Sequence, residues 1–258
     1  RSTYKNINRV RQIINVFLKY EFGHIIDQLR LNRYVSLRKR LKTFGQWPAI
    51  KGHTVPERLR MAFSELGPSF IKLAQLLSSR PDLITAPFAD EFKKLQDEVP
   101  PFPSDDAKRI IEEETHLPID KIFAKFHDKP TAAASIAQVH QGTLLDGSDV
   151  IIKVQRPDIR EQIETDINIL TTIAQLMDKH IPESRFFNPT GIVDEFSRTV
   201  RKELDFSEEA KNCLRFRKNF ENNPHIYIPR IHSSFSTEKI LTMERIEGVR
   251  IDDISGIE

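Results

Sequence analysis

Apolar residues recur at helical spacing along the first part of the chain. One stripe comprises Val10, Ile13, Ile14, Phe17 and Leu18, and a shorter one after Gly23 comprises Ile25, Ile26 and Leu29. This spacing predicts two amphipathic helices. Such helices either lie on a membrane surface or pack their apolar stripe against the rest of the protein, and the sequence leaves both alternatives open.

Prolines bound the next predicted helices. Residues 57–66 are expected to be helical, and a further helix begins after Gly67-Pro68 and ends before Pro81, because proline is tolerated in the first turn of a helix but not in its interior. The run "VPPFPSDD" at 99–106 marks a boundary, and its Ser-Asp-Asp suits the N-cap of a helix predicted at 105–115.

Strand-like patterns follow this boundary. "TAAASIAQVH" (131–140) enters a strand-like run, and "DVIIKVQ" (149–155) is a β-branched run typical of a buried strand. The turn between them contains Asp146-Gly147, a strong hairpin signal. Residues 158–220 have the pattern of charge-rich helices, and 226–246 that of two more strands. The sequence therefore predicts an α+β fold, with a helical N-terminal region before a mainly antiparallel lobe.

The charge is distributed unevenly. Residues 1–45 carry eleven basic and two acidic side chains, 11 − 2 = +9, within a chain of net charge +2. A basic end of this kind indicates an anionic partner, and anionic lipid, nucleic acid and an acidic protein face are all candidates. Lipid is favoured over nucleic acid because Ile13, Ile14, Phe17 and Leu18 offer insertable apolar surface, whereas no basic stretch is interleaved with aromatic residues for base stacking. No apolar run approaches the roughly 18 residues of a membrane-spanning helix.

Two further features limit the chemistry. The single cysteine, Cys213, permits no internal disulfide and is expected to be a small, partly buried helix residue. The eight histidines show no pairing at metal-ligand spacing, so a metal held by His and Cys is not expected.

A lone lysine, Lys153, lies within the second strand-like run. A buried, unpaired ammonium is too costly to keep, so Lys153 lies either on the exposed face of an edge strand or in a pocket facing an anion. The preceding run favours the pocket. A kinase phosphate-binding loop has the form G-x-G-x-x-G-x-V, and here Ala132, Ala134 and Ala137 take the glycine places and Val139 the valine place. The spacing from Val139 to Lys153 fits one strand, a tight turn and a return, which places the lysine beneath this loop.

Four motifs together resemble the UbiB family of atypical kinase-like ATPases of coenzyme Q (ubiquinone) biosynthesis, called ADCK in animals. They are "AAASIAQVH", "VIIKVQRPDI", "ELGPSFIKLAQLLSSRPDL" and "KELDFSEEAKN", and the resemblance covers about residues 57–258. It implies an atypical protein-kinase-like fold with a helical extension that carries a K-x-G-Q-type motif (57–104), a nucleotide-binding N-lobe (105–246) and the truncated start of a hinge and C-lobe (247–258). The apolar stripes and the charge of the preceding residues predict a separate basic amphipathic helical region at 1–56.

The resemblance also implies a set of site residues. The nucleotide-binding residues are Ala132, Ala133, Ala134, Ser135, Ile136, Ala137, Gln138, Val139 and Lys153, with a hinge at Met243, Glu244, Arg245 and Ile246. Lys153 and Glu209 are the implied catalytic pair. They are 56 residues apart, however, so an inserted helical segment must lie between them, and Glu161, Glu164, Asp166 and Glu195 are rival partners.

A regulatory lid is implied as well. In the family the K-x-G-Q helix folds across the active site, and here Lys72 and Gln75 match that motif, while Glu203 and Asp205 match its E-x-D partner. Without the resemblance, these four residues would be interpreted as ordinary solvated surface. The glycine of the motif is Ala74 here, which favours the helix by roughly 0.5–1 kcal/mol but adds a methyl group at an expected close approach.

The functional expectations follow from these motifs. The chain is expected to bind ATP or ADP with Mg²⁺, whose ligands lie beyond residue 258, and to act when full length as an ATPase or phosphotransferase. Alanines in the loop disfavour ordinary protein phosphorylation. The alternative is a pseudokinase-like scaffold without chemistry. Expected partners are adenine nucleotide, anionic lipid or a quinone precursor, and other ubiquinone-biosynthesis proteins, at the cytoplasmic face of a bacterial inner membrane or in mitochondria.

Overall fold

The computed structural model describes residues 2–31, 50, 52–95 and 99–249. The chain forms two compact units, and each is described separately. The helical unit comprises residues 1–98 and 158–201, and the sheet unit comprises residues 99–157 and 202–258. Among the described helices, none is long and apolar enough to cross a membrane.

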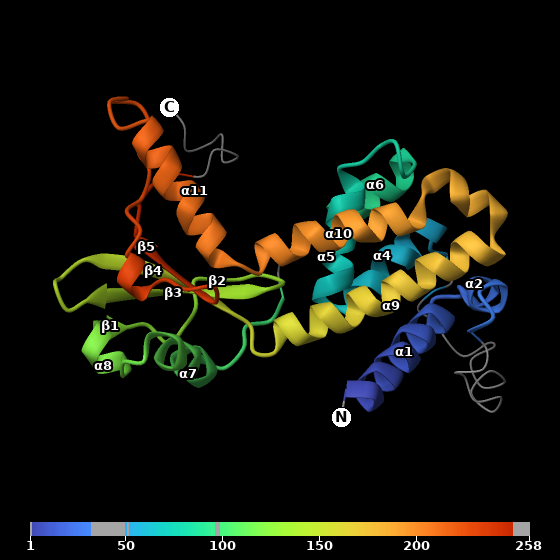
Figure 1. Ribbon diagram of the computed structural model, residues 1–258, viewed down its shortest axis with the longest axis horizontal. Helices are drawn as coiled ribbons and strands as arrows, with labels where there is room; N and C mark the ends of the chain where they lie inside the picture. Colours follow the sequence, from blue (N-terminus) through green and yellow to red (C-terminus); the bar gives the residue numbers. More distant parts are fainter. Residues whose placement is uncertain (1, 32–49, 51, 96–98, 250–258) are drawn as a thin grey trace. The chain divides into compact units, whose positions relative to one another are not determined.

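The helical unit is built from helices of both sequence segments (Figure 1). They are α1 (Ser2–Lys19), α2 (Gly23–Gln28), α4 (Val55–Leu66), α5 (Pro68–Ser78), α6 (Ala86–Lys93), α9 (Ile159–His180), the 3-10 helix η3 (Pro182–Phe187) and most of α10 (Pro189–Glu203). Predicted boundaries are confirmed for α4 and α5. A capping box between Thr54 and Glu57 starts α4, and Pro68 occupies the first turn of α5.

The apolar stripe of α1 is covered by the unit itself. Ile13 and Ile14 are 3% and 2% exposed, and α1 packs against α2, α4 and α9. Phe17 and Leu18 pack against the same cluster as Ile14. The expectation that this stripe supplies insertable surface is therefore wrong, because its apolar groups are used to hold the unit together. The basic run at 33–42 lies outside the described residues.

A buried ion pair joins three helices of this unit. The Arg9 guanidinium on α1 donates from Nε to Asp166 Oδ1 at 2.6 Å and from Nη2 to Oδ2 at 2.8 Å. Ser69 Oγ on α5 donates to Asp166 Oδ2 at 2.5 Å, and Arg9 also bonds the carbonyl of Leu66. Asp166 on α9 is fully buried, so these donors compensate the loss of its hydration.

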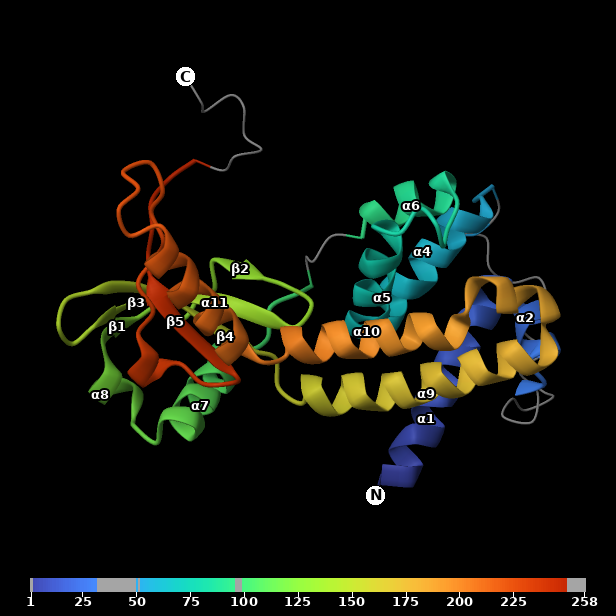
Figure 2. The ribbon, with the colours of Figure 1, turned by 45° about the horizontal axis from the view of Figure 1, so that its top comes forward.

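The sheet unit is a five-stranded antiparallel sheet with helices packed on it (Figure 2). Its elements are α7 (Ser104–Thr115), α8 (Ile119–Ile122), β1 (Phe123–Phe126), β2 (Ala132–Ala133), β3 (Ala137–Leu144), β4 (Asp149–Gln155), α11 (Phe206–Asn219), η4 (Ser233–Phe235) and β5 (Ile240–Glu244). The strand order is β1-β3-β4-β5, with β2 on β3. Gly147, at φ 87°, makes the predicted hairpin turn between β3 and β4.

The core of the sheet unit lies on one face of β4. Val150, Ile152 and Val154 are fully buried against Ala107 and Ile111 of α7. Period-2 alternation therefore sends Ile151, Lys153 and Gln155 to the opposite face. The sheet and α7 thus leave Lys153 on the face away from the main apolar cluster.

Two expectations about topology need correction. Residues 226–246 contain one strand, β5, instead of two, and Ile231 makes only an isolated bridge to Met243. Pro229 has no N–H to give to a ladder, which disfavours a strand here. The second correction concerns residues 158–201, expected within the lobe, which belong instead to the helical unit because the apolar face of α9 packs against α1 and α5. The pattern also failed to indicate α6 and β1.

Candidate functional site

Lys153 lies on a central strand. In the register of the sheet it stands opposite Val139 on β3 and Leu241 on β5. The edge-strand alternative is therefore wrong, and a lysine in this position needs a partner for its charge.

That partner is Glu209 on the first turn of α11. Lys153 Nζ lies 2.6 Å from Glu209 Oε2, and the two side chains are 28% and 42% exposed. The ammonium also lies 4.5 Å from the centroid of the buried Phe206 ring, a favourable cation–π distance. Both groups keep some access to solvent, so the ion pair borders a surface that a ligand can reach.

The rival carboxylates are engaged elsewhere. Asp166 binds Arg9, Glu164 is held bidentately by Arg201, and Glu195 accepts from Arg80 at 2.7 Å. These residues and Glu161 all belong to the helical unit. Among the five candidates, the structure brings Glu209 to Lys153.

The alanine-rich segment folds as a tight hairpin against β3. Ala132 and Ala133 form β2 opposite Val139 and Gln138, and Ala134 N–H donates to the carbonyl of Ala137 at 2.7 Å. The non-glycine residues with positive φ in the described chain lie outside 132–137. The backbone here needs no left-handed conformation, which is why alanine can replace glycine without strain.

Arg156 holds this hairpin in place. Its backbone N–H donates to the carbonyl of Ile136, and its Nε donates to the carbonyl of Ala134, each at 2.9 Å. Its Nη2 donates to the carbonyls of Val99 and Pro100, and burial lowers the pKa of the guanidinium from its ordinary value. Sequence reasoning missed this residue, and its position three residues after Lys153 was the available signal.

Strand register places the predicted nucleotide-binding residues on both faces of the sheet. Ala132, Val139 and Lys153 share one sheet face, and Met243 shares it through its pairing with Ile151. Ala133, opposite Gln138, points to the other face. Ser135 and Ile136 are buried at the hairpin tip.

The predicted hinge residues differ in their surroundings. Glu244 lies opposite Val150, on the core side of the sheet, and its carboxylate accepts from Tyr227 Oη at 2.6 Å and from Arg230 N–H at 3.0 Å. These bonds lower the pKa of Glu244. Ile246 follows the strand and is exposed.

The predicted lid residues lie in different units. Lys72 and Gln75 are half-buried on α5 in the helical unit, where Ala74 is fully buried, so its methyl group is accommodated there. Glu203 and Asp205 belong to the sheet unit, and Asp205 Oδ1 accepts from Ser207 N–H as the N-cap of α11. Contact between the two pairs stays a prediction.

Cys213 lies one helical turn after Glu209. Burial raises the pKa of its thiol, the Glu209 carboxylate raises it further, and Lys153 opposes both. Among the described residues, no group of three or more His, Cys, Asp or Glu side chains could hold a metal ion.

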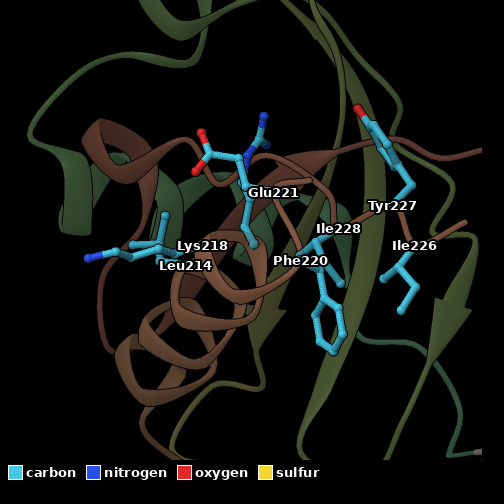
Figure 3. A pocket seen from close by; sticks show the side chains of 8 residues that line it. Leu214, Lys218, Phe220, Glu221, Ile226, Tyr227 and Ile228 are labelled. Carbon is cyan, nitrogen blue, oxygen red and sulfur yellow. The ribbon is translucent and has the colours of Figure 1, made fainter. Parts of the chain in front are cut away.

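A separate groove of about 570 Å³ opens at the other end of α11 (Figure 3). It is lined by Leu214, Arg217, Lys218, Phe220, Glu221, Ile226, Tyr227 and Ile228. Neither Lys153 nor Glu209 lines it, and the sequence analysis did not single it out.

The arrangement of hairpin, strand lysine and helix glutamate corresponds to the nucleotide lobe of kinase-like proteins. A family model described as the ABC1 atypical kinase-like domain matches residues 94–258. The chain belongs to this family. The expected kinase-like fold and the resemblance to UbiB proteins are thereby confirmed.

Curated relatives of this ABC1 chain carry the description "Probable protein kinase UbiB". One from Vibrio cholerae is 40% identical over 253 residues, covering 97% of this chain and 46% of the relative. One from Marinobacter nauticus is 43% identical over 252 residues, covering 98% and 46%. The chain thus spans about half the length of the curated relatives it matches.

A solved structure supports the fold. The complex of Rv3197 with erythromycin from Mycobacterium tuberculosis matches with a TM-score of 0.54 and 28% identity, covering 76% of this chain and 49% of that one. The ABC1 chain therefore shares a kinase-like fold with a protein of similar sequence.

Proposed function

We propose that this chain supplies the nucleotide-binding lobe of an ATPase that supports ubiquinone biosynthesis. The observation that carries the proposal is the Lys153–Glu209 ion pair on the central strand beside the alanine hairpin. Kinase-like proteins use such a lysine to bind the α- and β-phosphates of ATP and a helix glutamate to orient it. Mg²⁺ would screen the phosphate charge when bound, and the described residues offer no cluster of ligands for it.

The hairpin gives a reason for preferring ATP hydrolysis to protein phosphorylation. Arg156 fastens the backbone of the turn through the carbonyls of Ala134 and Ile136, and the turn residue Ser135 is fully buried. A loop held in this way is less able to close over the phosphates than a glycine-rich loop. Phosphates would therefore occupy a different position from that in ordinary protein kinases.

Nucleotide titration tests the proposal. In a protein of the relatives' full length, we expect Lys153→Ala to weaken Mg-ATP or Mg-ADP binding at least severalfold in calorimetry, because it deletes a charge-assisted phosphate contact. The 258-residue chain alone should bind weakly. Lys239→Ala is the matched control, since Lys239 also pairs with a glutamate, Glu114, in the sheet unit. Equal affinities of wild type and Lys153→Ala would refute the proposal.

The same proposal places the protein at a membrane surface. The +9 charge of residues 1–45 supports an anionic lipid partner, since each basic side chain near an anionic surface contributes about 1 kcal/mol and is screened within a Debye length. Binding to anionic vesicles should fall as salt rises and exceed binding to duplex DNA. Stronger binding to DNA would contradict this part of the proposal.

A further inference from the structure

Residues 99–103 form the entry segment, by which the chain passes into the sheet unit. The unit begins at Val99 and α7 begins at Ser104, and the entry segment itself is neither helix nor strand. Three of its five residues are prolines, whose fixed φ makes a segment semi-rigid. Because proline has no N–H, the entry segment has amide hydrogens only at Val99 and Phe102.

The fully buried side chain of Gln138 ties the entry segment to the alanine hairpin. Its Oε1 accepts from Phe102 N–H at 3.0 Å, and its Nε2 donates to the Phe102 carbonyl at 3.2 Å. The backbone of Gln138 stands opposite Ala133 in the hairpin. One residue therefore belongs to the hairpin and also satisfies both backbone groups of Phe102.

Arg156 makes a second tie between the same two segments. Its Nη2 donates to the carbonyls of Val99 at 3.3 Å and Pro100 at 2.9 Å, and its Cζ lies 5.6 Å from the centroid of the Phe102 ring. The Nε of the same guanidinium holds the carbonyl of Ala134. A guanidinium is planar and fixes its donors relative to one another, so a displacement of the entry segment acts on the hairpin.

The tie made by Gln138 lies on the far side of the sheet from the proposed phosphate contacts. Val139 stands opposite Lys153 and shares its face, whereas Gln138 stands opposite Val154, a member of the apolar core. Gln138 therefore acts on the hairpin from the face away from Lys153. This placement suits a residue that positions the hairpin without touching the phosphates.

We propose that Gln138 and Arg156 are positioning residues that couple nucleotide binding at the alanine hairpin to the entry segment. The inference rests on the nucleotide binding proposed above. A nucleotide that binds best to the fastened hairpin also favours the fastened entry segment. By thermodynamic reciprocity, releasing the entry segment from its bonds lowers the affinity for nucleotide by the same factor. The nucleotide site is thereby linked to the point where the chain arrives from the helical unit.

Calorimetry tests the coupling in a protein of the relatives' full length. Gln138→Leu removes the amide at similar volume, and Arg156→Lys keeps the charge but cannot reach three carbonyl groups at once. Each variant should bind Mg-ADP at least about fivefold more weakly than wild type, the lower end of ordinary coupling between sites. Arg109→Lys is the matched control, because Arg109 makes exposed ion pairs on α7 of the same unit, and its affinity should be unchanged.

Hydrogen exchange at the Phe102 amide distinguishes positioning from a structural role. In wild type, saturating Mg-ADP should slow this exchange at least about fivefold. In Arg156→Lys most of the slowing should be lost. A purely structural role would raise the exchange rate equally with and without nucleotide, and the slowing by Mg-ADP would then be intact in the variant.

The outcomes separate this inference from the proposed function. If wild type binds Mg-ADP and Phe102 exchanges at the same rate with and without it, the coupling is wrong and the nucleotide proposal stands. If both variants bind like wild type, or if Arg109→Lys weakens binding as much as they do, the two ties do not position the hairpin. If wild type does not bind nucleotide, the proposed function fails and this inference with it. Circular dichroism checks folding, and Arg156→Lys alone decides the question if Gln138→Leu does not fold.

Discussion

Removing Arg9 should destabilise the helical unit more than any surface ion-pair change in it. Arg9 and Asp166 bind through two parallel N–H···O bonds, and the side chains are 12% and 0% exposed. Arg9→Ala leaves a fully buried carboxylate without its guanidinium, a change that costs about 3–5 kcal/mol. Asp166→Ala removes the buried charge itself and mainly leaves the Ser69 hydroxyl without an acceptor, which costs about 1–3 kcal/mol.

The double variant should resemble Asp166→Ala. Once the carboxylate is absent, Arg9 retains its bond to the Leu66 carbonyl and its position 5.9 Å from the centroid of the Phe70 ring. The coupling free energy between positions 9 and 166 should therefore be close to the cost of Arg9→Ala itself, about 3 kcal/mol or more, at the upper end of the range seen for residues in one network.

Urea denaturation followed by circular dichroism gives the free energies of unfolding. Hydrogen exchange on peptides from α1, α5 and α9 assigns the loss to the helical unit. The matched control is Arg201 with Glu164, a bidentate pair of the same chemistry in the same unit, whose side chains are 51% and 39% exposed. An exposed pair of this kind should contribute about 0–1 kcal/mol.

The comparison can fail in two ways. If Arg9→Ala and Arg201→Ala reduce the free energy of unfolding equally, burial does not determine the strength of these pairs. If the changes at Arg9 and Asp166 are additive, the two groups do not act as a unit, and the geometry of the cluster has no energetic consequence.

Three further predictions concern the sheet unit. Burial lowers the pKa of His140. Its Nδ1 lies 2.9 Å from the His127 carbonyl oxygen, and its Nε2 lies 2.9 Å from Gln138 Nε2. As the pH falls, the unfolded chain therefore takes up a proton on this ring before the folded protein does. Stability should therefore fall as pH drops through about 6.5, by at most about 1.4 kcal/mol per pH unit for this group, and denaturation of His140→Gln should show a shallower slope. Asp205→Ala should lower the free energy of unfolding by about 0.5–2 kcal/mol, because it removes the N-cap of α11. Asp205→Asn should restore most of this loss in the same assay. Equal losses for the two variants would show that the capping hydrogen bond does not account for the loss. Arg156→Lys should speed hydrogen exchange in peptides spanning 131–139, because lysine cannot reach three carbonyl groups at once; unchanged exchange would show that the hairpin is stable without the clamp.

Local chemistry determined the parts of the fold that were predicted correctly. Proline and glycine fix the starts of α4 and α5 and the turn at Gly147, since their effects on the backbone need no tertiary contacts. Whether the apolar stripe of α1 faces a membrane or the protein core could not be derived in this way. Membrane and protein core are both apolar, so the pattern is the same for either, and only the packing of α1 on α9 distinguishes them.

The candidate site was predicted less directly. Spacing placed Lys153 beneath the alanine hairpin, but the choice of Glu209 among five carboxylates came from the family resemblance. Arg156 lies within the motif "VIIKVQRPDI", but its role could not be predicted, because a side chain that binds backbone carbonyls leaves no complementary residue type in the sequence. The nucleotide and membrane roles of these residues stay predictions.

The long separation between Lys153 and Glu209 has a structural explanation. The chain leaves the sheet unit at Asp158, forms α9 and most of α10 in the helical unit, and returns at Lys202. Gln155, just before the chain leaves the sheet unit, is bonded to the segment that returns to it. Its Nε2 donates to the carbonyl of Leu204 at 2.6 Å and to that of Glu238 at 2.9 Å. Leu204 is fully buried, and Phe206 N–H bonds the carbonyl of Glu238, so the start of α11 is fixed to the sheet at the level of Lys153. The length of the excursion matters little, since doubling a loop costs only about 0.6 kcal/mol in closure entropy. The position of Glu209 is therefore set by the hydrogen bonds that hold the start of α11 to the sheet. This explains how a lysine and a glutamate 56 residues apart can pair as they do in ordinary kinases, where a short connection joins the lysine strand to the glutamate helix.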